Sequence, residues 1–300
     1  MAPFLISIAM TYLGRFAPSP SGPLHMGSLV AALGSYLRAK SQSGKWLVRI
    51  DDLDPPREVA GSADAILRSL EAHGLHWDDS IFYQSSRFQD YQEQLQQLLS
   101  AKLAYACDCP RKRIQALGGF YDGHCRDRQL ATHQQGIRLR NQFPCYQFMD
   151  ELKGQITLEP HWAEEDFLLK RRDGYFAYQL AVVLVDHAQG ITEVVRGADL
   201  LETSGRHISL YQTLGLTPPK WAHLPLAVMA NGQKLSKQNH APQLSQQQVI
   251  SNLLQALTIL NQPLPENATH ASPDEVIQFA INHFDWQAIP KSNQLIESQV

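Results

Sequence analysis

Apolar residues in the first hundred positions form short runs that alternate with longer segments of helical periodicity. The short runs predict buried strands, and the longer segments predict helices because apolar residues recur every three or four positions. Strands that alternate with helices indicate a parallel sheet in a doubly wound α/β domain. The predicted strands are Tyr12–Ala17, Trp46–Ile50 and Ile81–Tyr83, and the predicted helices are Leu29–Lys40, Ala63–Gly74 and Arg87–Leu103.

This alternation breaks near Tyr105, so we expect an insertion between two halves of the sheet. It resumes at Asp166–Lys170 and continues to His223–Met229, and a further helix is predicted over Leu244–Leu260 before a polar tail rich in Gln and Asn. Between these bounds we expect ordered segments at Phe176–Val185 and Ile191–Val195 and a helix at His207–Leu214. The predicted divisions are an N-terminal extension (1–11), the first half of the domain (12–104), the insertion (105–160), the second half (161–240) and a short helical C-terminal region (241–300).

The composition narrows the class of protein. With 44% hydrophobic and 18% charged residues, the chain is neither disordered nor fibrous, and no apolar run approaches the ~20 residues of a membrane span. The net charge of −3 gives no overall positive field toward nucleic acid, but a local basic face remains possible. Residues 1–12 carry no Lys or Arg and therefore lack the charged start of a secretory signal, so we expect a cytoplasmic protein.

Two motifs at opposite ends of the predicted domain carry chemistry. The first runs from Arg15 to Ser28, and it places His25 and Gly27 where the first helix should begin and where exposed amides suit a phosphate. The second is Lys234-Leu-Ser-Lys237-Gln, in which two lysines flank a serine and can neutralise a pyrophosphate. Each motif alone could equally be an ordinary loop. The order of the two motifs in one doubly wound domain, however, favours nucleotide chemistry.

Together these motifs resemble the HIGH and KMSKS signatures of class I aminoacyl-tRNA synthetases. The strings R-F-A-P-S-P-S-G, R-I-D-D-L-D and V-V-R-G-A-D-L are most similar to the glutamyl branch, and the similarity runs from about Tyr12 to about His240. The resemblance implies a Rossmann-type class I catalytic domain that activates glutamate with ATP and Mg²⁺. It assigns catalytic roles to His25, Gly27, Lys234 and Lys237, and ATP binding to His25, Gly27, Ser28 and Lys237.

The same resemblance implies a glutamate pocket. Glutamate offers two carboxylates and one ammonium group, which match two arginines and one acid. Arg196 is the natural partner of the side-chain carboxylate, although an ion pair with Asp199 or Glu202 is the alternative for it. The residues that the resemblance assigns to the pocket are Arg15, Ser19, Asp51, Tyr178 and Arg196.

Val182 departs from the family pattern. Glutamyl-tRNA synthetases usually carry Asn four residues after the pocket tyrosine, and this chain has Val182 there. We therefore expect one hydrogen bond to glutamate to be missing, with weaker binding or a changed substrate pose as the consequence.

Three cysteines, Cys107, Cys109 and Cys125, have the spacing of metal ligands, and thiolates favour Zn²⁺. The resemblance implies Tyr121 as the fourth ligand, general chemistry suggests His124, and Cys145 is a third option. We expect one structural zinc per chain, which would stabilise an insertion that has little apolar core. The alternative is three thiols without a metal.

Basic residues concentrate in and after the insertion, where they can form either a track for an RNA backbone or a solvated charged face. The family uses this insertion for the acceptor end of tRNA, which favours the RNA track. The residues are Arg111, Lys112, Arg113, Arg126, Arg128, Lys170, Arg171 and Arg172.

The expected second substrate follows from the 63 residues after Lys237, which are too few for the anticodon-binding domains of a full glutamyl-tRNA synthetase. The chain, including the motif Ile114–Cys125, is similar to a stand-alone branch of the family that places glutamate on the queuosine base at the wobble position of tRNA(Asp) and uses the anticodon arm. We expect it to act as a monomer. The alternatives are acylation of a tRNA 3′ end and a catalytically silent RNA-binding paralogue, but His25, Gly27, Lys234 and Lys237 argue against a silent one.

Overall fold

The computed structural model describes residues 11–228 and 243–295, and it confirms the doubly wound α/β fold. Strands β1, β2 and β3 pair in parallel, and so do β9 and β10. Strand β9 lies beside β1. The Thr192 amide, just before β9, donates to the Leu13 carbonyl of β1 over 2.9 Å. The order β3-β2-β1-β9-β10 is that of a Rossmann-type sheet. These strands span Leu13–Phe16 (β1), Lys45–Ile50 (β2), Phe82–Tyr83 (β3), Glu193–Gly197 (β9) and Lys220–Leu224 (β10).

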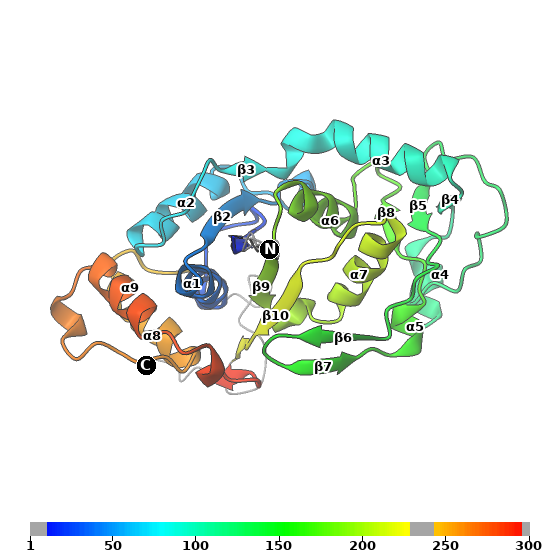
Figure 1. Ribbon diagram of the computed structural model, residues 1–300. Helices are drawn as coiled ribbons and strands as arrows, with labels where there is room; N and C mark the ends of the chain where they lie inside the picture. The colour runs from blue at the N-terminus through cyan, green and yellow to red at the C-terminus, as the bar shows by residue number, and fades with distance from the viewer. Residues whose placement is uncertain (1–10, 229–242, 296–300) are drawn as a thin grey trace, which may run out of the picture.

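Helices cover both faces of this sheet, as Figure 1 shows. Neighbouring residues of one strand pack into different hydrophobic clusters: Val194 faces the cluster with α6 and α7, and Val195 faces the cluster with α1 and α8. Alternation of this kind is expected when both faces of a parallel sheet are buried. The helices are α1 (Met26–Ser41), α2 (Ser62–Ala72), α3 (Phe88–Ser100), α6 (Tyr178–Ala188), α7 (Thr203–Thr213) and α8 (Val249–Ile259).

The region between the two halves of the sheet contributes strands to two places. Strands β4 and β5 pair with each other, and β5 also pairs with β8, all antiparallel, so the strand predicted at Asp166–Lys170 lies in the sheet of the insertion. Strand β6 instead pairs with β10 of the central sheet and forms a hairpin with β7. The elements are β4 (Ala104–Cys107), α4 (Arg111–Ala116), β5 (Gly136–Leu139), β6 (Gln147–Asp150), β7 (Gly154–Thr157), α5 (Pro160–Ala163) and β8 (Leu168–Lys170).

Helices of the C-terminal part pack at the opposite end of the molecule from strands β4 and β5 of the insertion (Figure 1). Helix α9 (Pro273–Asn282) lies beside α8 and α1, within the region predicted to be helical but in a polar tail where no separate helix was predicted. A capping box defines its start: Ser272 accepts from the Glu275 amide, and Glu275 accepts from the Ser272 amide. Strand β12 (Gln294–Leu295) pairs with β11 (Ala227–Val228), so this segment also completes a small parallel sheet.

Every helix within 11–228 and 243–295 is too short or too polar to span a membrane.

Candidate functional site

A cavity of about 480 Å³ opens at the carboxyl ends of β1 and β9, where open parallel sheets bind ligands. A second cavity of about 460 Å³ adjoins it, and the two share Ser19, Arg57 and Tyr178 as walls. Asp51 lines the second cavity. The other described residues that the sequence assigned to glutamate or ATP all line the first cavity: Arg15, Ser19, His25, Gly27, Ser28, Tyr178 and Arg196.

His25 prepares the start of α1 for an anion. Helix α1 begins at Met26, three residues before the predicted start, because the His25 side chain caps it by accepting from the Ser28 amide over 3.2 Å. Since Nδ1 is the acceptor, the proton of the neutral ring lies on Nε2, where it can serve a phosphate oxygen. Gly27 adds an amide at the positive end of the helix, whereas the Ser28 amide is already bonded to His25.

Arg15 is held by a buried network of alternating charges. Its guanidinium donates to both carboxylate oxygens of Asp186, over 3.1 and 3.2 Å, and Arg49 joins Asp186 (2.5 Å) to Asp51 (2.7 Å). Burial opposes ionisation of Asp186, but Arg15 and Arg49 lower its pKa to about 2. The network presents Arg15 to the cavity in one orientation. No role was assigned to Asp186 or Arg49 from the sequence, although Arg49 begins the string R-I-D-D-L-D and Asp186 is an acid within the apolar run of α6.

Asp51 lines the second cavity but is largely buried, with 8% of its surface exposed. Burial raises its pKa, although the neighbouring Arg49 acts in the opposite direction. A cationic group beside Asp51 in the second cavity would therefore stabilise its ionised form. This environment suits an acid that receives a substrate ammonium.

Arg196 is a buried guanidinium with neutral partners. It is 6% exposed, and it donates to the Tyr178 hydroxyl (3.1 Å), the Ser204 hydroxyl (2.8 Å) and the Leu200 carbonyl (3.1 Å). Within the described ranges no carboxylate lies within 4.0 Å of it, so the alternative ion pair with Asp199 or Glu202 does not form. Burial lowers its pKa, as expected for a cation without a counter-ion. Such a group on a cavity wall is prepared for an anionic ligand.

Val182 lies away from the site. It is 1% exposed and packs in the hydrophobic cluster with α6 and α7, and the structure does not place it on the wall of either cavity. Its effect on glutamate affinity stays a prediction.

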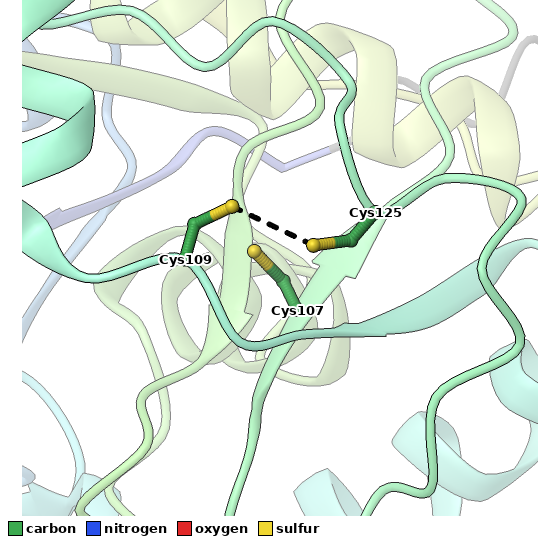
Figure 2. Close-up of side chains that lie close together, drawn as sticks. All are labelled: Cys107, Cys109 and Cys125. Atoms are coloured by element: carbon green, nitrogen blue, oxygen red, sulfur yellow. Dashed lines mark hydrogen bonds between the residues drawn. The ribbon is translucent and has the colours of Figure 1, made fainter.

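Figure 2 shows Cys107, Cys109 and Cys125 with their sulfurs turned toward one another. The three Sγ atoms lie within 4.8 Å of one another, with 3.5 Å between those of Cys109 and Cys125. Burial and the neighbouring thiols raise the pKa of Cys109 to about 12, so the Cys109 thiol stays protonated at neutral pH unless a cation is beside it. A divalent metal reverses that preference, and this cysteine cluster could hold one.

The three candidates for the fourth ligand differ in their distance from the cysteine cluster. Tyr121 is buried against Cys107 and Cys125, and its hydroxyl accepts from the Cys125 amide over 2.6 Å. His124 is exposed and lies outside the cluster, and Cys145 is buried elsewhere and donates to the Gln147 carbonyl. The geometry therefore favours Tyr121.

The predicted basic residues divide into two groups. Arg113, Arg126, Arg128 and Arg171 form ion pairs with Asp122, Asp166, Asp108 and Asp54, whereas Arg111, Lys112, Lys170 and Arg172 form none with described residues. A cleft of about 840 Å³ lies between the insertion and the first half of the domain, and it adjoins the second cavity. We call it the arginine cleft, because it is lined by Arg57, Arg111, Arg138, Arg171 and Arg172.

Lys234 and Lys237 of the second motif lie outside the described residues.

Comparison with known proteins gives consistent findings. A family described as tRNA synthetases class I (E and Q), catalytic domain, matches residues 12–262. A glutamyl-Q tRNA(Asp) synthetase of Shewanella oneidensis is 56% identical over 95% of this chain and 94% of the relative, and one of Vibrio cholerae is 52% identical over the same shares. The crystal structure of a glutamate tRNA ligase from Elizabethkingia meningosepticum, in complex with its amino acid, superposes with a TM-score of 0.78 and 26% identity, covering 96% of this chain and 67% of that one.

Proposed function

The chain belongs to the catalytic-domain family of the class I tRNA synthetases for E and Q, and on this premise we propose that it activates glutamate with ATP and transfers it to the queuosine base of tRNA(Asp). The observation that carries glutamate recognition is Arg196, a buried guanidinium on the cavity wall with neutral partners. The names of the relatives at 52–56% identity support queuosine as the acceptor.

The two adjoining cavities together provide a complement for each charged group of glutamate. Arg196 would take the side-chain carboxylate, and Asp51 would take the ammonium group. Arg15, whose Nε and one terminal nitrogen are held by Asp186, keeps its other terminal nitrogen for the α-carboxylate. The hydroxyl of Tyr178 accepts from Arg196 and would close the wall between the two cavities.

Activation needs positioning and charge neutralisation rather than a protein nucleophile. An α-carboxylate oxygen of glutamate attacks the α-phosphorus of ATP, the bond to the β-phosphate oxygen breaks, and pyrophosphate leaves. His25 and the first amides of α1 would hold phosphate oxygens, and Lys234 and Lys237 would neutralise the leaving pyrophosphate together with Mg²⁺. A hydroxyl of queuosine then attacks the glutamyl carbonyl, and AMP leaves.

The function is tested with ATP, labelled glutamate and tRNA(Asp) that either carries or lacks queuosine. We expect label only on the tRNA with queuosine, in a bond that base hydrolyses because it is an ester. Equal labelling of both tRNAs would support acylation of a 3′ end instead. Absence of glutamate-dependent ATP–pyrophosphate exchange would support the silent RNA-binding paralogue. These substrates place the proposed reaction in the cytoplasm, and we expect a monomer by light scattering.

The arginine cleft is the proposed path of the anticodon arm toward the active site. It adjoins the second cavity through Arg57 and Arg171, so an RNA backbone along it would end beside Tyr178 and Ser19. Arg111 and Arg172 are the best candidates for phosphate contacts, because neither forms an ion pair with described residues.

Replacing Arg111 and Arg172 together with alanine should weaken tRNA binding about tenfold and reduce the salt dependence by about two phosphate contacts. Glutamate-dependent ATP–pyrophosphate exchange should stay unchanged, because it needs no tRNA contact. Arg68→Ala is the matched control, since Arg68 is an exposed arginine of α2 outside the cleft. Unchanged tRNA affinity in the double variant would refute this path.

The metal of the cysteine cluster is proposed to be zinc, held by Cys107, Cys109 and Cys125 with Tyr121 as the fourth ligand. Purified protein should contain about one zinc per chain, and Cys107→Ser with Cys125→Ser should remove it and lower the thermal stability of the insertion. Cys145→Ser is the matched control, because that buried thiol lies outside the cluster and its loss should leave the zinc content unchanged. Elemental analysis gives the metal content, and zinc in the double variant would contradict the assignment.

A further inference from the structure

A buried chain of polar groups lies behind Arg196, on the side away from the cavity. Asp150 at the end of β6 contacts His223 of β10, with 2.6 Å between Oδ2 and Nδ1. The other ring nitrogen, Nε2, lies 3.2 Å from Nε of Arg196 and 3.1 Å from the hydroxyl of Ser204 on α7. Asp150, His223 and Ser204 are all at most 1% exposed. None of these three residues was assigned a role from the sequence.

The hydrogen bonds around Asp150 fix the tautomer of His223. The amides of Leu152 and Lys153 both donate to Oδ1 of Asp150, over 3.1 and 2.9 Å. The carboxylate therefore only accepts, and Nδ1 of His223 must carry the ring proton. Nε2 is then an acceptor, as the Nε–H donor of Arg196 requires. A proton on Nε2 would face that donor and repel the guanidinium.

The charges around His223 keep its ring neutral. Arg196 on β9 faces it directly, Lys153 after β6 and His207 on α7 lie on further sides, and Asp150 is the anion in direct contact with it among the described residues. Burial and Arg196 lower the pKa of His223 to about 4, although Asp150 opposes the shift. At neutral pH the ring is therefore an uncharged acceptor for Arg196.

We propose that Asp150 and His223 are positioning residues for glutamate recognition: Asp150 sets the tautomer of His223, and His223 orients the Arg196 guanidinium toward the side-chain carboxylate of the substrate. The proposal rests on the proposed function, because it deepens the role of Arg196 there. Arg196 has no carboxylate partner among the residues described, so its direction depends on neutral acceptors. Among these acceptors, the ring of His223 is the one whose tautomer is set by a further residue, Asp150.

A nucleophilic role for the same residues does not fit the geometry. Ser204, His223 and Asp150 contact one another in the same succession as the residues of a hydrolase triad. Oγ of Ser204 lies 3.1 Å from Nε2 of His223, and Nδ1 of His223 lies 2.6 Å from Oδ2 of Asp150. The Ser204 hydroxyl, however, is fully buried and accepts from Arg196 over 2.8 Å, so it cannot reach a substrate. The chain of contacts ends on Arg196, which does line the cavity.

Asp150→Asn is the sharpest test, because it keeps the shape of the side chain and reverses one hydrogen bond. The amide oxygen of the new side chain would be retained by the Leu152 and Lys153 amides, which leaves its NH₂ group facing Nδ1 of His223. The ring proton must then move to Nε2, against Arg196. We expect the Kd for glutamate, measured by calorimetry, and the KM for glutamate in ATP–pyrophosphate exchange to rise about tenfold or more. The KM for ATP should stay unchanged.

Substitutions at His223 distinguish positioning from a general loss of stability. His223→Leu removes the acceptor and should raise the Kd for glutamate at least as much as Asp150→Asn, whereas His223→Gln offers an amide oxygen to Arg196 and should restore part of the affinity. Adding Asp150→Asn to His223→Leu should cost no further affinity, since no tautomer remains to be set. His73→Leu is the matched control, because His73 is an equally buried histidine that contacts Ser69 and Asn252.

The outcomes separate this inference from the proposed function. Wild-type Kd and KM for glutamate in Asp150→Asn would overturn the positioning role, as would an equal loss in His73→Leu. Glutamate binding that weakens in Asp150→Asn, without any exchange activity in the wild-type chain, would support the positioning and contradict the proposed function. A wild-type chain that does not bind glutamate would overturn both.

Discussion

Replacing Arg196 with methionine is expected to lower kcat/KM for glutamate in ATP–pyrophosphate exchange by about 10²- to 10⁴-fold. The reason is that a carboxylate of the substrate would enter a buried wall without its cationic partner, and an unpaired buried charge costs about 3–5 kcal/mol. The neutral partners of Arg196 cannot compensate, because the groups around it are acceptors or are already bonded. The KM for ATP should change little, since the nucleotide is proposed to bind at the start of α1.

Two further variants sharpen this prediction. Arg196→Lys keeps the charge but loses the forked geometry, so we expect an intermediate loss. Arg38→Met is the matched control, because Arg38 is a largely buried arginine that pairs with Glu193 and does not line the cavity. Steady-state exchange kinetics at several glutamate concentrations measure all three. Retention of wild-type kcat/KM in Arg196→Met would exclude this residue as the carboxylate partner.

The order of the elements was predictable because it depends on local periodicity. The strands β1, β2 and β3 and the helix α1 follow directly from the apolar pattern, and the parallel sheet is confirmed. The prediction began α1 at Leu29 because its first turn, from Met26 to Ser28, is held by the His25 cap rather than by apolar spacing. Helix α9 was not predicted as a separate element of the helical C-terminal region, although the capping box at Ser272 and the apolar positions Val276, Ile277 and Ala280 both indicated it.

The support of the site could not be predicted, because it joins residues that are distant in the chain. Asp150 and His223 are 73 residues apart and meet because β6 pairs with β10 across the central sheet. Asp186 meets Arg15 only after α6 packs onto the strand that carries Arg15. The family resemblance identified Arg15 and Arg196, which line the cavity, but the partners that orient them depend on the tertiary fold.

Replacing Asp186 with asparagine is expected to lower the free energy of unfolding by about 3–5 kcal/mol at neutral pH. The variant leaves Arg15 and Arg49, which are 3% and 0% exposed, without the carboxylate that lies between them. Urea unfolding at pH 7 measures the loss. Asp79→Asn is the matched control, since the pair of Asp79 with Lys45 is more than half exposed and should contribute about 1 kcal/mol or less.

The pH dependence of this difference tests whether the charge of Asp186 is the cause. The pKa of Asp186 in the folded chain is about 2, against an ordinary value of 3.8, so its stabilising contribution is present above pH 3.8 and is lost as the pH falls through 2. The gap between wild type and Asp186→Asn should therefore be constant near neutral pH and should narrow between about pH 4 and pH 2, because a protonated carboxyl resembles the amide. A gap that stayed the same down to pH 2 would show that shape and packing, rather than the buried charge, stabilise this network.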